Sequence, residues 1–170
     1  MKLFHKVTFF TFLMIFSIYF DANSQSIQSE IKDLSKGADI IVTGKVIDQK
    51  SQWNSEKSKI YTLVTLQVEE FLKGSTNQDR VIITHLGGEV GAVGETYSHV
   101  PTFKDDEDVL VFLKKSDKDQ TISVFEGDGG KMTLHLDKIS GEKVTSKNIN
   151  ASEIKKEIKN YVERQWWLIL

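Results

Sequence analysis

The sequence contains no cysteine among its 170 residues. This absence excludes disulfide bonds, thiol catalysis and zinc sites with cysteine ligands. The charges are nearly balanced, because 22 lysines and arginines stand against 24 aspartates and glutamates. The two signs are interspersed along the chain and form no basic stripe, which disfavours a nucleic-acid partner.

Long apolar runs are also missing after the N-terminus. The one extended run, Val7–Phe20, follows a basic start and is shorter than the roughly 20 residues of a membrane-spanning helix. Small residues at Ala22 and Ser24 precede a predicted cleavage site at Gln25, so residues 1–24 are predicted to be a secretory signal peptide. We therefore expect an exported protein, extracellular or periplasmic, without a membrane span after cleavage. Export without cysteine is typical of a bacterial protein.

The remaining sequence fits one domain and begins with a helical pattern. Apolar residues recur at helical spacing in residues 27–36, and Gly37 follows as a C-terminal cap, so residues 25–37 form a predicted N-terminal helix. The β-branched run IIVTGKVI predicts a first strand, in which Gly44 marks a bulge or bend. Residues 48–58 are polar and are expected to form a loop with Trp53 in its middle.

An alternation over 60–69 predicts the clearest strand of the chain, with one face formed by Ile60, Thr62, Val64, Leu66 and Val68. Similar patterns predict strands at 80–86, 95–100, 108–114, 121–125 and 131–136, and the 108–114 strand is apolar on both faces, as a central strand would be. Residues 137–150 are expected to be a linker. Residues 151–170 are predicted to form a C-terminal helix, with Asn150 or Ser152 as the N-cap. Short turns between strands and helices only at the ends indicate a mainly β, antiparallel fold.

The order of these segments resembles the netrin-type domain, also found in tissue inhibitors of metalloproteinases. The resemblance rests on ADIIVTGKVI, IYTLVTLQVEEFLKG and VPTFKDDEDVLVFL, and bacterial secreted proteins contain similar stretches. It implies an OB-like antiparallel β-barrel over residues 38–136, on which the C-terminal helix packs. The family's animal inhibitors chelate the protease zinc with an N-terminal cysteine, and this chain has no cysteine to take that role.

A cluster of glycines at 87, 88, 91 and 94 follows a predicted strand. A dinucleotide fingerprint needs a G-x-G-x-x-G spacing that opens a helix. Here the spacing differs and a strand is expected next, so the pattern favours a bent hairpin loop.

Two histidines flank this predicted hairpin. If its centre lies near Ala92, His85 and His99 face each other across the ladder, about 5 Å apart. They are then weak candidates for metal ligands, with Glu89 or Glu95 as an oxygen donor, but a zinc site needs three well-held ligands. An exposed cross-strand pair is the preferred interpretation.

The sequence contains two carboxylate clusters, and neither has the pattern of a catalytic or metal site. Glu69 and Glu70 are expected on opposite faces of their strand, which excludes an acid–base pair. The 105–108 cluster lacks the spacing of a calcium loop and is expected to be a solvated turn.

Aromatic and apolar residues around the hairpin suggest a recognition surface, since OB-type barrels bind ligands on one face and its loops. An alternative is that Trp53 covers one end of the barrel. The C-terminal run WWLIL is expected to pack against the barrel, or else to form an exposed apolar patch. The candidate binding residues are Trp53, Glu89, Tyr97, His99, Pro101 and Phe103.

We therefore predict a secreted, non-catalytic module without a cofactor, which binds another extracellular or periplasmic protein through these loops. Two alternatives stay open. One is a metalloprotease inhibitor that works without cysteine, and the other is a metal-dependent enzyme that uses His85 and His99.

Overall fold

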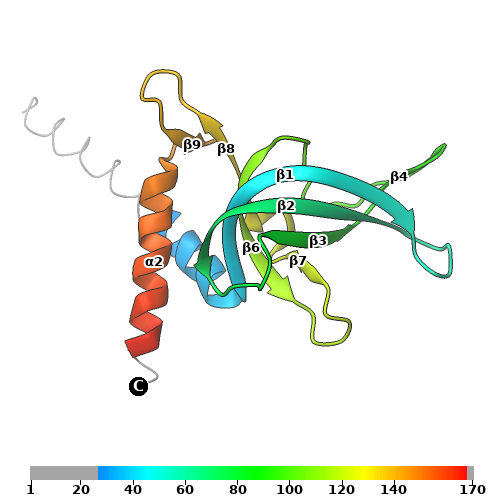
Figure 1. The fold of residues 1–170 in the computed structure, drawn as a ribbon, viewed down its shortest axis with the longest axis horizontal. Coiled ribbons are helices and arrows are strands. Elements are labelled where there is room, and N and C mark those ends of the chain that lie inside the picture. The colour runs from blue at the N-terminus through cyan, green and yellow to red at the C-terminus, as the bar shows by residue number, and fades with distance from the viewer. Residues whose placement is uncertain (1–26, 168–170) are drawn as a thin grey trace, which may run out of the picture.

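The computed structural model describes residues 27–167, which form an antiparallel β-sheet with a helix at each end (Figure 1). The predicted mainly β, antiparallel fold class is therefore confirmed. The predicted signal peptide over residues 1–24 lies outside the described residues. The side chains of the C-terminal run WWLIL, residues 166–170, also lie outside them.

Two long strands, β1 (Ile40–Trp53) and β2 (Ile60–Lys73), pair along their whole length. The predicted alternation of β2 is confirmed, because Ile60, Thr62, Val64 and Leu66 are all buried. The predicted polar loop at 48–58 is wrong in its first half, since residues 48–53 continue β1. These residues satisfy the backbone of the first half of β2, which would otherwise lack a partner on that side.

Gly44 lies at a bulge, as predicted. The register of β1 against β2 shifts between Thr43 and Gly44. A Cβ atom on Gly44 would lie 2.2 Å from the carbonyl oxygen of Gln67, so only glycine allows the two backbones to approach this closely. The bulge adds to the strong curvature of β1 and β2 in Figure 1.

The main sheet has the strand order β3-β2-β1-β6-β8-β9, and β7 pairs with the other half of β6. Most of the predicted strands are found within one or two residues of their expected bounds. These strands are β3 (Arg80–Leu86), β6 (Asp108–Lys115), β7 (Ile122–Val124) and β8 (Lys131–Leu136). The sheet also contains β9 (Lys143–Thr145), which was not predicted.

Strand β6 is central, as its apolar pattern predicted, and it separates two cores. Val109, Val111 and Leu113 point into a core on the concave side of the sheet, together with residues of β1, β2 and β3. Leu110 and Phe112 point into a second core, which the two helices cover. Both faces of the strand are therefore buried.

Closure of the sheet into a barrel is not seen. The Cα atoms of β3 and β7 come within 8 Å of each other. However, no ladder joins these two edges in the described part of the chain. Strand β7 has only three residues, which leaves little backbone for a second pairing.

The glycine-rich stretch after β3 forms a separate two-stranded sheet, β4 (Gly88–Val90) and β5 (Val93–Glu95). The predicted strand at 95–100 is wrong, because the strand that follows the reversal, β5, begins at Val93 and already ends at Glu95. Gly91 has a φ of 63°, which favours glycine, and the reversal at 91–92 pairs Val90 directly with Val93. Residues 96–107 then return towards the sheet without forming a strand.

The helices lie on one side of the sheet (Figure 1). Residues 27–37 are helical, as predicted, and α2 (Ala151–Trp167) follows β9. Asn150 is the N-cap of α2, because its Oδ1 accepts the backbone N–H of Ser152 at 2.8 Å. The expected 137–150 linker is wrong in part, since it contains β9. Neither described helix is long and apolar enough to cross a membrane.

Candidate functional site

A groove of about 450 Å³ lies between the β4–β5 hairpin, the 96–103 segment and the adjoining parts of β1, β2 and β3. Its lining comprises Gln49, Ser51, Thr62 and residues 85–89, 94–97 and 100–103. The hairpin projects from the same end of the molecule as the β1–β2 turn (Figure 1). The groove is therefore formed where these two hairpins leave the sheet.

Two glycines hold the hairpin against the sheet. The Gly87 N–H donates to the carbonyl of Ile60 at 2.8 Å, and the Thr62 hydroxyl donates to the Gly87 carbonyl at 2.7 Å. Gly88 has a φ of 128°, and a Cβ there would lie 2.3 Å from the hydroxyl oxygens of both Ser51 and Thr62. Gly87 and Gly88 thus allow the hairpin to lie against the sheet and form one wall of the groove.

Glu95 and Tyr97 form a polar pair on the hairpin side of the groove. The Glu95 Oε2 accepts the backbone N–H of Ile60 at 2.9 Å and the Tyr97 hydroxyl at 3.1 Å. The hydrogen bond to Glu95 raises the pKa of Tyr97 above its ordinary value of 10.0. Tyr97 therefore stays protonated and donates to the carboxylate at neutral pH.

Phe103 also lines the groove, is only 8% exposed, and is held from two directions. Its ring stacks on that of His85, with 6.0 Å between the ring centroids and 24° between the planes. The Lys131 Nζ lies 4.9 Å from the Phe103 centroid and donates to the carbonyl of Thr102 at 2.7 Å. The cation–π contact and the hydrogen bond together fix this part of the lining.

Lys131 is itself held by a buried ion pair with Glu107. The Nζ-to-Oε1 distance is 2.8 Å, and each side chain is only 9% exposed. Burial raises the pKa of Glu107, but hydrogen bonds from Lys131, Thr133 and the Lys104 N–H outweigh it, so the pKa lies below its ordinary value. Glu107 is thus ionised at neutral pH and anchors the lysine under Phe103.

The structure brings four of the six predicted binding residues together. Glu89, Tyr97, Pro101 and Phe103 all line the groove. The other two lie outside its lining. Trp53 is half-buried at the end of β1, where it pairs with Ile60. The His99 side chain is 87% exposed, with its Nδ1 4.0 Å from Asp128.

The predicted cross-strand pair of His85 and His99 is wrong. The ladder of the hairpin ends at Gly88 and Glu95, and the register partner of His85 is Thr62 on β2. The predicted centre of the hairpin was nearly right, but the chain leaves the ladder before His99. Residues 27–167 contain no group of three or more histidine, aspartate or glutamate side chains arranged to hold a metal ion.

The acidic turn at 105–108 differs from its prediction. Asp105 and Asp106 are exposed, as expected, but Glu107 belongs to the buried pair with Lys131. Asp108 also lies 3.4 Å from Lys143, so the turn is tied to the sheet at two points rather than simply solvated.

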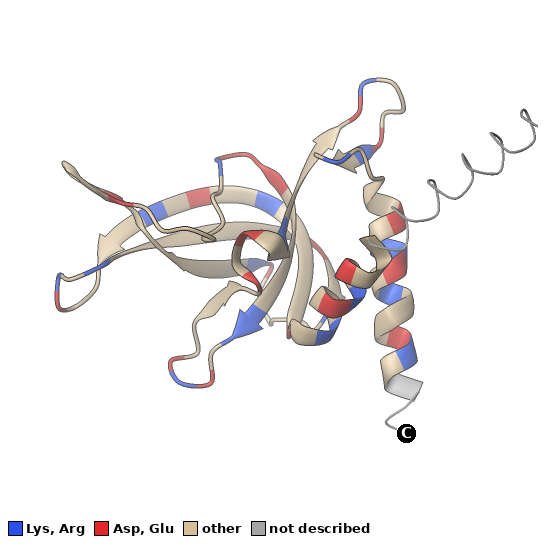
Figure 2. Cartoon of the chain, turned by 180° about the vertical axis from the view of Figure 1, so that it is seen from behind, with Lys and Arg blue, Asp and Glu red and all other residues tan. Residues whose placement is uncertain are grey.

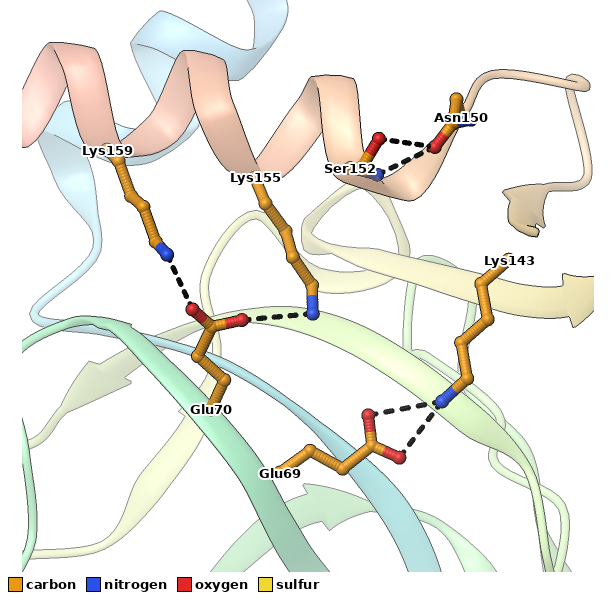
Figure 3. Close-up of polar contacts among 7 residues, drawn as sticks. All are labelled: Glu69, Glu70, Lys143, Asn150, Ser152, Lys155 and Lys159. Atoms are coloured by element: carbon orange, nitrogen blue, oxygen red, sulfur yellow. Dashed lines mark hydrogen bonds and ion pairs between the residues drawn. The ribbon is translucent and has the colours of Figure 1, made fainter.

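Glu69 and Glu70 bind lysines from two elements of the C-terminal region (Figure 3). Glu69 accepts from Lys143 of β9, and Glu70 accepts from Lys155 and Lys159 of α2. The prediction that Glu69 and Glu70 lie on opposite faces assumed a regular strand. In the structure Thr43 pairs with Glu70 and Gly44 pairs with Val68, so Glu69 is the extra residue of a bulge. The hydrogen bond from Lys159, followed by that from Lys155, outweighs desolvation and lowers the pKa of Glu70. These pairs tie β2 to the C-terminal region.

Sequence reasoning named Glu95 only as a possible metal ligand, and it missed Ser51, Thr62 and Lys131 as parts of the site. Ser51 and Thr62 have hydroxyl oxygens 2.9 Å apart on paired strands. Extending the first predicted strand to Trp53 would have placed them opposite each other. No local sequence signal links Lys131 to Phe103, because the two residues belong to distant segments.

No protein-family model matches the chain, and neither does any curated protein. The resemblance to netrin-type domains therefore stays a prediction. The functional interpretation therefore rests on the geometry of the groove and on the charges of its lining.

Proposed function

We propose that this protein is an exported, non-catalytic module that binds another extracellular or periplasmic protein in the groove beside the β4–β5 hairpin. The observation that carries the proposal is the convergence of Glu89, Tyr97, Pro101 and Phe103 on that one groove. Glu89 lies in β4 and the other three in the segment after β5, and all four were predicted to bind from their residue types and from the ligand-binding face of OB-type barrels.

The composition of the lining supports a protein as the partner. The exposed Tyr97 can supply apolar area and a ring contact, and the buried Pro101 and Phe103 form the rigid apolar base of the groove beneath it. Tyr97 is 37% exposed and Val93, at the end of the hairpin, is 46% exposed. A partner that covers the hairpin would remove both apolar side chains from water.

An OB-like architecture is part of the proposal. The curved sheet, the bulge at Gly44 and the approach of β3 to β7 are features that such a barrel would have. In such folds a ligand binds on one face and on its loops, and the groove has an equivalent position here.

A photoreactive residue tests the proposed function. We expect p-benzoylphenylalanine at position 97 to crosslink to a discrete protein of the exported fraction, and excess wild-type protein to compete with the adduct. The matched control carries the same residue at position 139 on the β8–β9 turn, where Ile139 is 97% exposed. Equal adducts from both positions, or none from position 97, would contradict the proposal.

Inhibition of a metalloprotease is a second candidate, favoured by one observation. The β1–β2 and β4–β5 hairpins project side by side from one end, as a wedge that could enter a protease cleft (Figures 1 and 2). If this is correct, excess protein should inhibit at least one member of a metalloprotease panel, and replacing Val93 at the hairpin end by aspartate should relieve the inhibition. A panel that is uninhibited throughout would argue against this candidate.

A further inference from the structure

The charged residues that line the groove are all acidic. Glu89 and Glu95 belong to the lining, and no lysine or arginine side chain does. The nearby Lys131, which lies behind Phe103, is paired with Glu107 at 2.8 Å, so its charge is compensated. The β4–β5 hairpin carries the same two acids and no basic residue, and Figure 2 shows only acidic colour on it. The field inside the groove therefore favours a cation.

Glu95 is half-buried and receives only neutral donors. Both hydrogen bonds that reach it in the described part of the chain end on Oε2, from the Ile60 N–H and the Tyr97 hydroxyl. No lysine, arginine or histidine of residues 27–167 forms an ion pair with it. This differs from Glu69, Glu70 and Glu107, each of which binds a lysine. Glu95 thus retains capacity for a positively charged donor.

Of the two aromatic side chains in the groove, Phe103 and Tyr97, only Tyr97 has a ring that is free to contact a ligand. Phe103 is already engaged by His85 and by the ammonium group of Lys131. Tyr97 is 37% exposed, and its hydroxyl is fixed on Glu95. A guanidinium or ammonium group that binds Glu95 would therefore lie beside an available ring, a combination that suits arginine in particular.

The hairpin also offers an open strand edge. β5 pairs with β4 on one side, and no other strand of the described residues pairs with its second side. Val93 and Gly94 are exposed, and Gly94 has no side chain to obstruct an approaching backbone. An extended peptide can bind such an edge through backbone hydrogen bonds, while its alternate side chains enter neighbouring pockets.

We propose that the groove binds an extended segment of the partner protein that carries an arginine or lysine, with its backbone paired to β5 and its cation bound to Glu95 beside the ring of Tyr97. This inference rests on the proposed function and specifies its partner. Glu89 adds negative charge at the hairpin, and the half-buried Val100 is available to the apolar residues that flank the cation.

The test uses the purified protein and fluorescent nonapeptides with blocked termini and a β-prone Thr/Val sequence. The central residue is arginine, lysine, glutamine or glutamate, and binding is measured by fluorescence anisotropy at low and high salt. We expect the arginine peptide to bind and the glutamate peptide not to bind. N-methylation of alternate backbone amides should abolish binding of the arginine peptide, because these groups pair with β5.

Matched variants assign the effect to Glu95. Glu95→Gln keeps an acceptor for the Ile60 N–H but removes the charge, so we expect about a tenfold weaker affinity for the arginine peptide, as for loss of one charge-assisted hydrogen bond. Glu56→Gln is the control, since Glu56 is exposed in the β1–β2 turn and outside the groove lining. It should leave the affinity unchanged.

Three results would overturn the inference. They are equal binding of arginine and glutamate peptides, equal loss in both variants, or equally tight binding of free N-acetylarginine amide, which has no strand to add. The proposed function has a separate readout. If the crosslink from position 97 persists unchanged in Glu95→Gln, the cationic specificity is wrong while protein binding stands; if no crosslink forms at all, the proposed function itself fails.

Discussion

Replacement of Lys131 by methionine should strongly destabilise the protein, because it leaves the Glu107 carboxylate buried without its cation. The two side chains are each 9% exposed and 2.8 Å apart. Removing one partner of a buried ion pair costs about 3–5 kcal/mol. Since about 1 kcal/mol moves the melting temperature of a domain of this size by about 3 °C, Tm should fall by about 10 °C in a calorimetric scan.

A double variant separates the charge effect from lost packing. In Lys131→Met with Glu107→Gln, no uncompensated charge remains, and glutamine can still accept the Lys104 N–H, which is 3.0 Å from the carboxylate in the native protein. We expect the double variant to recover at least half of the Tm lost by Lys131→Met. A single-variant loss below about 3 °C, or a double variant that is no more stable than the single one, would refute the reasoning.

The pH dependence of stability supplies an independent check. The folded-state pKa of Glu107 lies below its ordinary value of 4.5, so its contribution to stability is present above pH 4.5 and is lost as pH falls through the folded pKa. In Lys131→Met the main depressing contact is gone and burial dominates, so the pKa should rise. Mild acidification should then narrow the stability gap between variant and wild type. A gap that widens between pH 7 and pH 5 would contradict this assignment.

Two further variants test the fold. Gly44→Ala should lower the free energy of unfolding by about 1–3 kcal/mol in urea titrations, because its Cβ would meet the Gln67 carbonyl oxygen at 2.2 Å. Gly129→Ala is the control and should change little, since no atom lies within 4 Å of its Cβ position; equal losses would show that the close approach at Gly44 is not what matters. Asn150→Ala should cost about 1 kcal/mol through loss of the α2 N-cap, and an unchanged stability would exclude the capping role.

Much of the sheet could be predicted, because burial of one or both faces of a strand leaves a simple pattern of apolar residues in the sequence. The alternation of Ile60 to Leu66 and the two-faced apolar pattern of Val109 to Leu113 each correspond to a buried strand. The strand predictions were wrong where pairing with a neighbouring strand outweighs the polar composition of a segment. Residues 48–53 are polar, yet they form a strand because β2 extends beside them.

The candidate site was predictable in part, because its hydrogen-bonding and aromatic residues cluster near the glycines. The groove's other determinants depend on contacts between distant segments. Lys131 lies under Phe103, and Glu95 accepts the N–H of Ile60, neither of which has a local signal. The predicted pairing of His99 with His85 was wrong for a different reason. The ladder of the hairpin has only three residue pairs and ends before it reaches His99.

Hydrogen–deuterium exchange with and without the crosslinking partner tests the central claim most directly, because binding slows exchange where backbone groups become protected. We predict slower exchange in residues 88–103, with the strongest effect at β5, and unchanged exchange in the β8–β9 hairpin. Slowing confined to the β8–β9 hairpin or α2, with residues 88–103 unaffected, would contradict the assignment of the groove as the protein-binding site.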